Sequence, residues 1–288
     1  MGGLGNQIFQ YALAQWLCQE WNVSPVLFDP GSDAVPGRLN RAVQLSGLFP
    51  DCRILSGPAA KAIHVLSLSR KYQGALSAIG FRHYPFLAPE PSWQRLIPTL
   101  VEATQRRYSV ISGYFQFGEL VRTQLDRLRC GAATELEKRG ARLSTRGGLQ
   151  NMDFERDCLV HVRRGDYTKI EGYPLLDHNY YSRAREVIGR QGFRGRMYCV
   201  SDDPVEAGRM LSSAGFSTVS LDICDPLDVL GAIANARYKI IANSTLSLWG
   251  ALLGREDGRV VFPARWLPGN QEVPALCRSV GWLECQAG

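Results

Sequence analysis

The second half of the sequence alternates apolar, strand-like runs with helical patterns, and this alternation limits the possible folds more than any other feature. Strand-like runs lie at 158–163, 197–201, 218–221, 239–242 and 260–262. Between them, apolar residues recur at helical spacing at 179–190, 205–214, 227–235 and 246–253. Strands that alternate with helices form right-handed βαβ units, so we expect an α/β fold with a parallel, doubly wound sheet.

The first half of the sequence is less regular and predicts a separate α/β domain. Helices and strands are expected after the glycine-rich opening and then at 24–29, 43–49, 58–71, 108–115 and 120–142. The aromatic stretches 81–93 and 173–181 are interpreted as loops that help to select an acceptor. The glycine pair at 147–148 indicates a linker, which gives domains at residues 1–150 and 151–288.

The composition is that of an ordinary globular protein with a mild positive charge. The 288 residues carry a formal charge of +6, which suits an anionic ligand or a negatively charged membrane surface. Basic residues form no block with interleaved aromatics, so a nucleic-acid partner is not expected. The eight cysteines include no Cys-x-x-Cys pair, so no metal site is predicted. We find no secretory leader and no apolar run long enough to span a bilayer, which predicts a cytoplasmic location.

The strand-like run at 158–163 ends in a charged sequence, His161-Val162-Arg163-Arg164-Gly165-Asp166. Ligands of open α/β sheets bind outside the carboxyl ends of the strands, so these side chains fall where such a fold binds its ligand. Two arginines at a buried strand end are costly unless an anion meets them, and a guanidinium fits a phosphate or carboxylate in a bidentate way. The alternative is a structural ion pair between one arginine and Asp166 or Glu171.

Two further stretches place polar residues at the expected start of a helix. Gly2-Gly3-Leu4-Gly5-Asn6-Gln7 opens the chain, and Asn243-Ser244-Thr245 follows the strand-like run at 239–242. Glycines let a backbone approach a ligand closely, and a helix N-terminus favours an anion. The alternatives are a tight turn for the first stretch and plain helix capping for the second.

The sequence Ser201-Asp202-Asp203-Pro204-Val205-Glu206 contains two adjacent carboxylates. Asp203 before Pro204 is typical of a helix N-cap followed by proline at the first helical position, with Glu206 as a capping carboxylate. Asp202 then remains at the carboxyl end of a strand, where it can bind a ribose or a base edge. Because one carboxylate is assigned to capping, we predict no metal site here.

Taken together, these stretches resemble the α-1,2-fucosyltransferases of glycosyltransferase family 11, of the bacterial type. The resemblance covers nearly the whole chain. Leu248 departs from the family pattern, which often has an aromatic residue there, and the strand that usually precedes the family's glycine loop is absent from this sequence. The matching sequences are Gly2-Gly3-Leu4-Gly5-Asn6-Gln7-Ile8-Phe9-Gln10-Tyr11-Ala12, His161-Val162-Arg163-Arg164-Gly165-Asp166-Tyr167, Tyr198-Cys199-Val200-Ser201-Asp202-Asp203, Asn243-Ser244-Thr245-Leu246-Ser247-Leu248-Trp249-Gly250-Ala251 and Phe262-Pro263-Ala264-Arg265-Trp266.

The resemblance implies a GT-B-like fold with two Rossmann-like domains. It also implies an inverting enzyme, a galactoside 2-α-L-fucosyltransferase, that moves fucose from GDP-β-L-fucose to O2 of a galactose in a glycan acceptor. No metal or other cofactor is implied. Such an enzyme would work in the bacterial cytoplasm, build a surface polysaccharide such as O-antigen, and attach peripherally to the inner membrane.

The resemblance also implies roles for individual residues. Arg163 would hold the diphosphate, and Asn6 would meet the sugar or the diphosphate. Glu171 is the candidate general base, with Asp166 as the alternative, because an inverting transfer requires a carboxylate near the acceptor hydroxyl. The residues assigned to GDP-fucose binding are Gly5, Asn6, His161, Arg163, Arg164, Asp202, Asn243, Ser244 and Thr245.

Two other functions remain open at this point. An α-1,6- or protein O-fucosyltransferase would share the His-x-Arg-Arg-Gly-Asp sequence and differ in the linkage that it makes. A non-catalytic glycan- or nucleotide-binding protein would bind the donor without turnover.

Overall fold

The computed structural model describes residues 2–29, 43–69, 77–78, 80–86, 92–145, 147–169, 172–221, 223, 225–267 and 270–286. The chain divides into two compact units, Met1–Gln124 and Leu125–Gly288. The boundary falls inside helix α5 (Gly118–Leu143), so residues 125–150, which the sequence assigned to the first domain, belong to the second unit. The reason is that the second half of α5 is bound to the helix Pro226–Asn235, where Arg139 Nη1 lies 2.7 Å from Asp228 Oδ1.

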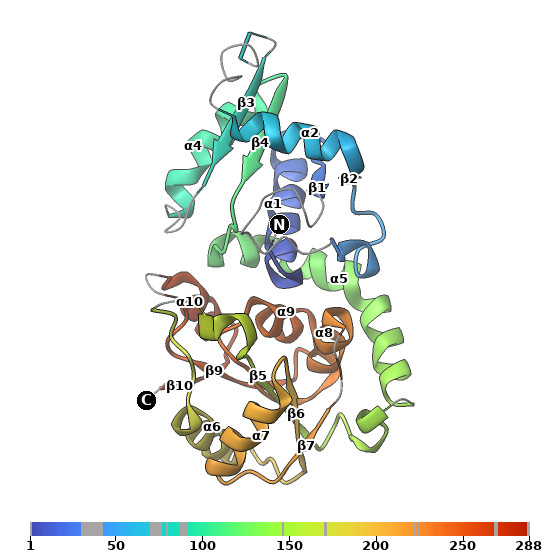
Figure 1. Cartoon of the computed structure of the whole chain (residues 1–288), viewed down its shortest axis with the longest axis vertical. Helices are drawn as coiled ribbons and strands as arrows, with labels where there is room; N and C mark the ends of the chain where they lie inside the picture. The colour runs from blue at the N-terminus through green and yellow to red at the C-terminus, as the bar shows by residue number, and fades with distance from the viewer. Residues whose placement is uncertain are drawn as a thin grey trace. The chain divides into compact units, whose positions relative to one another are not determined.

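The second unit is built on one parallel sheet of six strands (Figure 1). The order across the sheet is β7-β6-β5-β8-β9-β10. This order confirms the doubly wound fold that the alternating pattern predicted. The strands are β5 (Cys158–Val162), β6 (Met197–Ser201), β7 (Thr218–Ser220), β8 (Tyr238–Ile240), β9 (Arg259–Pro263) and β10 (Leu283–Cys285).

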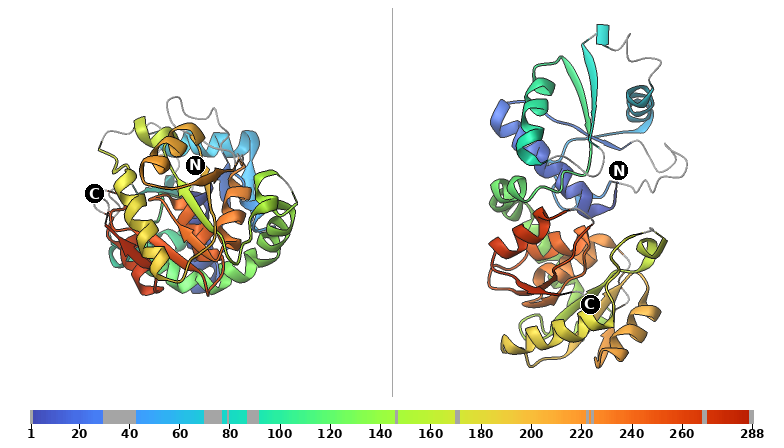
Figure 2. Two further views of the ribbon diagram at one scale, coloured as in Figure 1. Left: turned by 90° about the horizontal axis from the view of Figure 1, so that it is seen from below. Right: turned by 90° about the vertical axis from the view of Figure 1, so that its left-hand side faces the viewer.

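Helices cover both faces of this sheet (Figure 2). Helices α6 and α7 lie on one face and α8 and α9 on the other, as right-handed crossovers require when the winding direction changes. Along β5, Cys158, Val160 and Val162 join the core cluster that includes Tyr180 and Tyr181 of α6. The helices are α6 (His178–Arg190), α7 (Pro204–Ser213), α8 (Pro226–Asn235), α9 (Thr245–Leu253) and α10 (Glu272–Ser279).

The described strands of the first unit form two short parallel pairs, β1–β2 and β3–β4. Helix α1 is the most deeply buried element here, with Ile8, Phe9 and Ala12 fully buried. Trp16 and Trp93 pack edge to face, with ring centroids 4.6 Å apart. The elements are α1 (Leu4–Trp21), β1 (Leu27–Asp29), β2 (Ile54–Ser56), α2 (Gly57–Leu68), β3 (Phe81–Pro85), α4 (Trp93–Thr104) and β4 (Tyr108–Ser112).

Several sequence expectations for the first unit were wrong. The strand expected at 43–49 contains a 3-10 turn, η1 (Leu45–Gly47). The loop expected at 81–93 contains β3, which pairs with β4 over five residues, and the helix α4 was not foreseen. In β3 only Tyr84 is buried, so the strand has no continuous apolar run by which to recognise it. Among the described residues, no helix is long and apolar enough to cross a membrane.

Candidate functional site

The predicted donor-binding sequences of the second unit extend from three neighbouring strands, β6, β5 and β8, and β5 and β8 form the point where the winding direction changes. From β5 the chain winds through β6 to β7, and from β8 it winds in the opposite direction through β9 to β10. The two strands pair in parallel, with Val160 opposite Ile240. Doubly wound sheets bind ligands beyond the carboxyl ends of the strands at such a switch point. Arg163 and Arg164 follow one of these strand ends, and Asn243 follows the other.

Asp202 connects the two arginines. Its Oδ2 lies 3.1 Å from Arg163 Nη1, and its Oδ1 accepts a 2.9 Å hydrogen bond from the backbone N–H of Arg164. Asp202 follows β6, which pairs with β5, so the strand order brings the carboxylate to the arginines. Asp202 was expected to remain available for a ribose or a base; instead, both of its oxygens contact the arginine residues. A contact between Asp202 and a nucleotide stays a prediction.

Gly165 makes room for this arrangement. A Cβ atom at position 165 would overlap the Asp202 carboxylate. Arg163 thus has a structural ion pair, but its partner is Asp202. An ion pair with Asp166 or Glu171, the partners named from the sequence, stays a prediction because those side chains lie outside the described residues.

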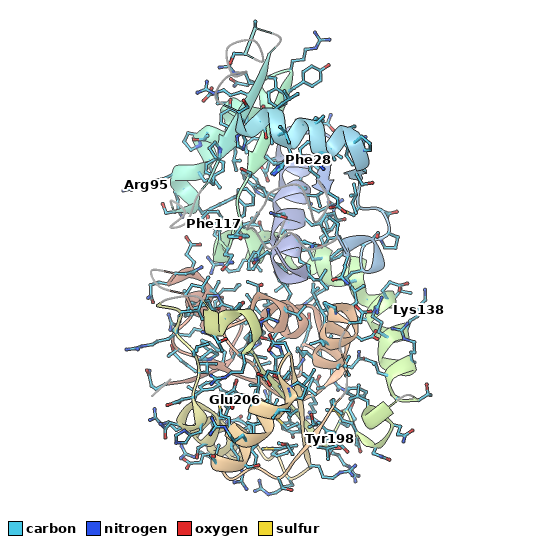
Figure 3. All side chains as sticks on the ribbon, in the orientation of Figure 1. Phe28, Arg95, Phe117, Lys138, Tyr198 and Glu206 are labelled. Carbon is cyan, nitrogen blue, oxygen red and sulfur yellow. The ribbon has the colours of Figure 1, made fainter. Side chains whose placement is uncertain are left out.

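Arg164 is held on two sides by the protein. Its Nη1 donates to the carbonyl of Leu176, and its Nη2 donates to Glu206 Oε1, both at 3.2 Å. Glu206, labelled in Figure 3, also accepts a 2.8 Å hydrogen bond from Arg209 Nε. These hydrogen bonds, from Arg209 first and then from Arg164, lower the pKa of Glu206 to about 2, so its carboxylate is ionised at neutral pH.

The cap of α7 explains why Glu206 can turn to Arg164. Asp203 Oδ1 accepts a 3.1 Å hydrogen bond from the Glu206 backbone N–H, which confirms Asp203 as the N-cap with Pro204 following it. The backbone N–H of Asp203 donates to Ser201 Oγ at 3.0 Å. In a capping box this N–H would donate to the side chain of Glu206. The expected capping role of the Glu206 side chain was therefore wrong.

His161 is buried in β5, with only 3% of its surface exposed. Burial, and secondarily the positive charge of Arg163, lower the pKa of its ring to about 3. Its imidazole is therefore neutral at physiological pH. It can offer a hydrogen-bonding ring nitrogen but no positive charge to a phosphate.

The stretch between β8 and α9 forms the second corner of the site. Ser244 is the N-cap of α9, and its side chain makes no capping hydrogen bond with any described residue, so plain capping does not account for it. Thr245 begins the helix and is partly exposed. Ser247, fully buried, instead donates to the carbonyls of Ala242 and Ser244 at 3.1 Å. The first N–H groups of α9 are thus available by position to meet an anion.

A loop segment, Tyr173–Leu176, contacts both corners. The Tyr173 hydroxyl donates to the carbonyl of Asn243 at 2.9 Å, and Asn243 Nδ2 donates to the carbonyl of Pro174 at 2.6 Å. The Tyr173 ring also packs on Tyr167, with centroids 4.1 Å apart. The loop expected at 173–181 ends at Asp177, because α6 begins at His178 and buries Tyr180 and Tyr181. A role of 173–177 in selecting an acceptor stays a prediction.

The predicted residues Gly5 and Asn6 lie in the first turn of α1, in the first unit. Asn6 Oδ1 accepts a 3.2 Å hydrogen bond from Gln116 Nε2. Gln116 follows Phe115, which has a left-handed backbone with φ of 55°, an uncommon and strained conformation for an aromatic residue. No local pattern indicates this partner, because Gln116 lies 110 residues away along the chain. A meeting of Asn6 with the donor stays a prediction.

The structure describes the two candidate bases only in part. Glu171 lies outside the described residues. Asp166 lies in the 3-10 turn η4 (Gly165–Lys169), of which the backbone is described at that position. Within the described residues, no three His, Cys, Asp or Glu side chains come together as a metal site.

Two known glycosyltransferases are similar in sequence to this chain. No family model matches the sequence. The chain is 26% identical over 294 residues to the O-antigen biosynthesis glycosyltransferase WbnK of Escherichia coli, covering 94% of each protein. It is also 32% identical over 120 residues to an α-1,2-colitosyltransferase of E. coli, covering 37% of this chain and 40% of that protein. These relatives support a role in glycosyl transfer.

The fold has a counterpart among solved structures. A glycosyl transferase of family 9 from Veillonella parvula DSM 2008 matches with a TM-score of 0.51 at 9% identity, covering 99% of this chain and 84% of that one. The fold is GT-B. The likeness confirms the fold class expected from the sequence.

Proposed function

We propose that the chain is an inverting glycosyltransferase that moves L-fucose from GDP-β-L-fucose to O2 of a galactose in a glycan. The single observation that carries this proposal is the geometry at the switch point. There, Arg163 at the end of β5 and the N-terminus of α9 after β8 extend from paired strands. A guanidinium and a helix N-terminus both favour the negative charge that develops on a departing diphosphate.

The same arrangement supports transfer without a metal. In this proposal Arg163 and the first N–H groups of α9 stabilise the leaving GDP, and Ser244 and Thr245 hold phosphate oxygens. His161 offers a neutral ring nitrogen to the nucleotide. Asp202 and Glu206 keep the arginines in place through the ion pairs at 3.1 and 3.2 Å. Transfer that requires an added divalent ion, abolished by a chelator, would contradict this part.

The acceptor hydroxyl has to lose a proton as the new bond forms. We assign this step to Glu171, with Asp166 as the alternative, and assign Asn6 to the sugar. If Glu171→Gln retained near-wild-type turnover with unchanged GDP affinity, the assignment to Glu171 would be wrong. The same result for Asp166→Asn would exclude the alternative.

A second donor sugar follows from one specific observation. The relative that is 32% identical over 120 residues is named an α-1,2-colitosyltransferase. Activated colitose is therefore the second candidate donor, with the same α-1,2 linkage. Competition between the two donors at equal concentration, read as product masses, would assign the preferred sugar.

The experiment that tests the function is an incubation with GDP-fucose and a panel of galactose-terminated glycans that includes lactose. Released GDP together with an α-1,2-linked product, identified by NMR, is the expected result. An α-1,6-linked or protein-linked product would assign the chain to a different fucosyltransferase type. Binding of GDP-fucose without turnover across the panel would favour a non-catalytic binding protein.

A further inference from the structure

The two corners of the proposed donor site come from separate parts of the chain. The register between β5 and β8 pairs Cys158 with Tyr238 and Val160 with Ile240. The segments that follow the two strands continue beyond these paired residues. Arg163 and Asn243 lie beyond this register. Something other than the sheet ladder has to fix the spacing between the arginine corner and the α9 corner.

The loop segment Tyr173–Leu176 supplies one such connection beyond the strand ends, in addition to the buried hydroxyls of Tyr180 and Tyr181, which donate to Ile241 and His161. At one end, Tyr173 and Pro174 make the two reciprocal hydrogen bonds with Asn243, at 2.9 and 2.6 Å. At the other end, the Leu176 carbonyl accepts from Arg164 Nη1 at 3.2 Å. The segment is therefore bound to the residues that follow both strands.

A stack of side chains makes a second connection through the same tyrosine. The Tyr173 ring packs on the Tyr167 ring at 4.1 Å. The guanidinium of Arg163 lies over the Tyr167 ring, 4.9 Å from its centroid. A cation over an aromatic face is attracted by the ring quadrupole, so the stack restrains the orientation of Arg163. Tyr173 thus touches Asn243 with its hydroxyl and, through Tyr167, supports Arg163 with its ring.

We propose that Tyr173 is a positioning residue that holds Arg163 and the start of α9 at the separation that a nucleoside diphosphate requires. This inference rests on the proposed function of the site as a donor site. It assigns Asn243 to positioning as well, since both its backbone carbonyl and its side-chain amide bind the loop segment. Diphosphate contacts then belong to Arg163, Ser244 and Thr245.

The test compares two single-atom changes, Tyr173→Phe and Tyr180→Phe. Both tyrosine hydroxyls donate to a backbone carbonyl in the stretch between β8 and α9: Tyr173 to Asn243 at 2.9 Å, and Tyr180 to Ile241 at 2.7 Å. Tyr180 is fully buried in the core. Loss of its hydroxyl should therefore lower the melting temperature more than loss of the partly exposed Tyr173 hydroxyl. The pair therefore separates loss of positioning from loss of stability.

GDP affinity by calorimetry and the KM for the donor are the readouts. We expect Tyr173→Phe to weaken GDP binding and raise the donor KM by about three- to tenfold, with an unchanged acceptor KM. Tyr180→Phe should keep the donor KM within about twofold of wild type, because it removes a hydrogen bond only from the core side of the stretch. Equal donor KM and GDP affinity in wild type and Tyr173→Phe would overturn the inference, as would an equal change in both variants.

Failure of the proposed function gives a different pattern. If the wild-type chain binds no GDP, both the donor site and the role of Tyr173 are refuted. If the wild-type chain binds GDP but transfers no sugar, the enzymatic proposal fails, and the GDP affinities of the two variants still decide the role of Tyr173.

Discussion

Two charged clusters lie at opposite ends of the same six-stranded sheet. The carboxyl-end cluster contains Arg163, Arg164, Asp202 and Glu206, which follow β5 and β6. The amino-end cluster precedes β5, β8 and β9, where Arg255 binds Glu155 and Asp257, and Arg237 lies near both of these carboxylates. Both clusters consist of ion-paired arginines, so charge alone does not distinguish a ligand site from a structural network. The amino-end contacts are Arg255–Glu155, Arg255–Asp257, Arg237–Glu155 and Arg237–Asp257.

The surroundings of the two clusters do distinguish them. The carboxyl-end cluster lies at the switch point beside the N-terminus of α9, where folds of this type bind ligands. The amino-end cluster lies near the fully buried Lys239, whose Nζ donates to the carbonyl of Ala234 at 3.3 Å. Burial, and then the charge of Arg255, lower the pKa of Lys239 to about 7. Ion-paired arginines therefore point to a ligand site only where they follow the carboxyl ends of the strands at the switch point.

The largest effect is expected from removing the carboxyl-end arginine that is assigned to the diphosphate. Arg163→Ala should lower kcat/KM by about 100-fold or more, since a preorganised donor to developing negative charge is lost. Arg255→Ala is the matched amino-end control. Its exposed ion pairs are worth at most about 1 kcal/mol of stability, so its kcat/KM should stay close to wild type. Initial rates with the donor varied would check this, and equal losses in both variants would contradict the comparison.

A smaller effect is expected from the partner of Arg164. Glu206→Gln keeps the shape of the side chain and removes the charge that binds Arg164 at 3.2 Å. The donor KM should rise by up to about tenfold, because the hydrogen bond between two charged groups is replaced by a weaker one with a neutral partner. Glu284→Gln is the control, since Glu284 binds Arg278 at 2.6 Å on the peripheral strand β10. A donor KM that is unchanged in Glu206→Gln would show that Arg164 needs no carboxylate partner.

Stability should respond at the amino end of the sheet. The unfolded chain protonates Lys239 below about pH 10.5, whereas the folded chain does so only below about pH 7. Between these values the unfolded state holds the extra proton, so the free energy of unfolding rises with pH, by at most about 1.4 kcal/mol per pH unit.

Lys239→Met should remove this rise and increase the free energy of unfolding at pH 7. Lys138→Met is the control on the exposed face of α5, where Lys138 lies 2.9 Å from Glu135 (Figure 3). Denaturant unfolding from pH 7 to 10 would measure both variants. The same pH slope in wild type and Lys239→Met would contradict the buried, neutral lysine.

The smallest effect is an absence of titration. With a pKa lowered to about 3, His161 should show constant ring resonances between pH 5 and 8, assigned by comparison with His161→Gln. The unfolded chain protonates this histidine near its ordinary pKa of about 6.5, whereas the folded chain does so only near pH 3. The free energy of unfolding therefore falls as the pH is lowered from about 6.5 toward 3. A titration midpoint above about 5.5 would show that the ring reaches water.

The sequence predicted the second unit well, because its signal is long and periodic. The run from Cys158 to Val162 is fully buried, as the apolar pattern indicated, and its arginines follow it directly. The ion pair of Arg163 with Asp202 was not predictable, since it depends on which strand lies beside β5. Spacing along the chain carries no information about that neighbour.

Contacts of loops with backbone atoms were also beyond the sequence. The sequence places Tyr173 in an aromatic loop but does not reveal that its hydroxyl binds the carbonyl of Asn243, because every residue has such a carbonyl. Gln116 was missed for a related reason, because its approach to Asn6 depends on the left-handed backbone at Phe115. Such contacts depend on tertiary structure, which local sequence patterns do not encode.

The missing side chain at Gly165 has a consequence for any attempt to redesign this protein. The Asp202 carboxylate occupies the volume that a Cβ at 165 would fill. In a mutational library, positions 165 and 202 should therefore behave as one locus. Variants at 165 would be recovered only together with a shorter side chain at 202, and each such pair would also have to supply a new counter-charge for Arg163.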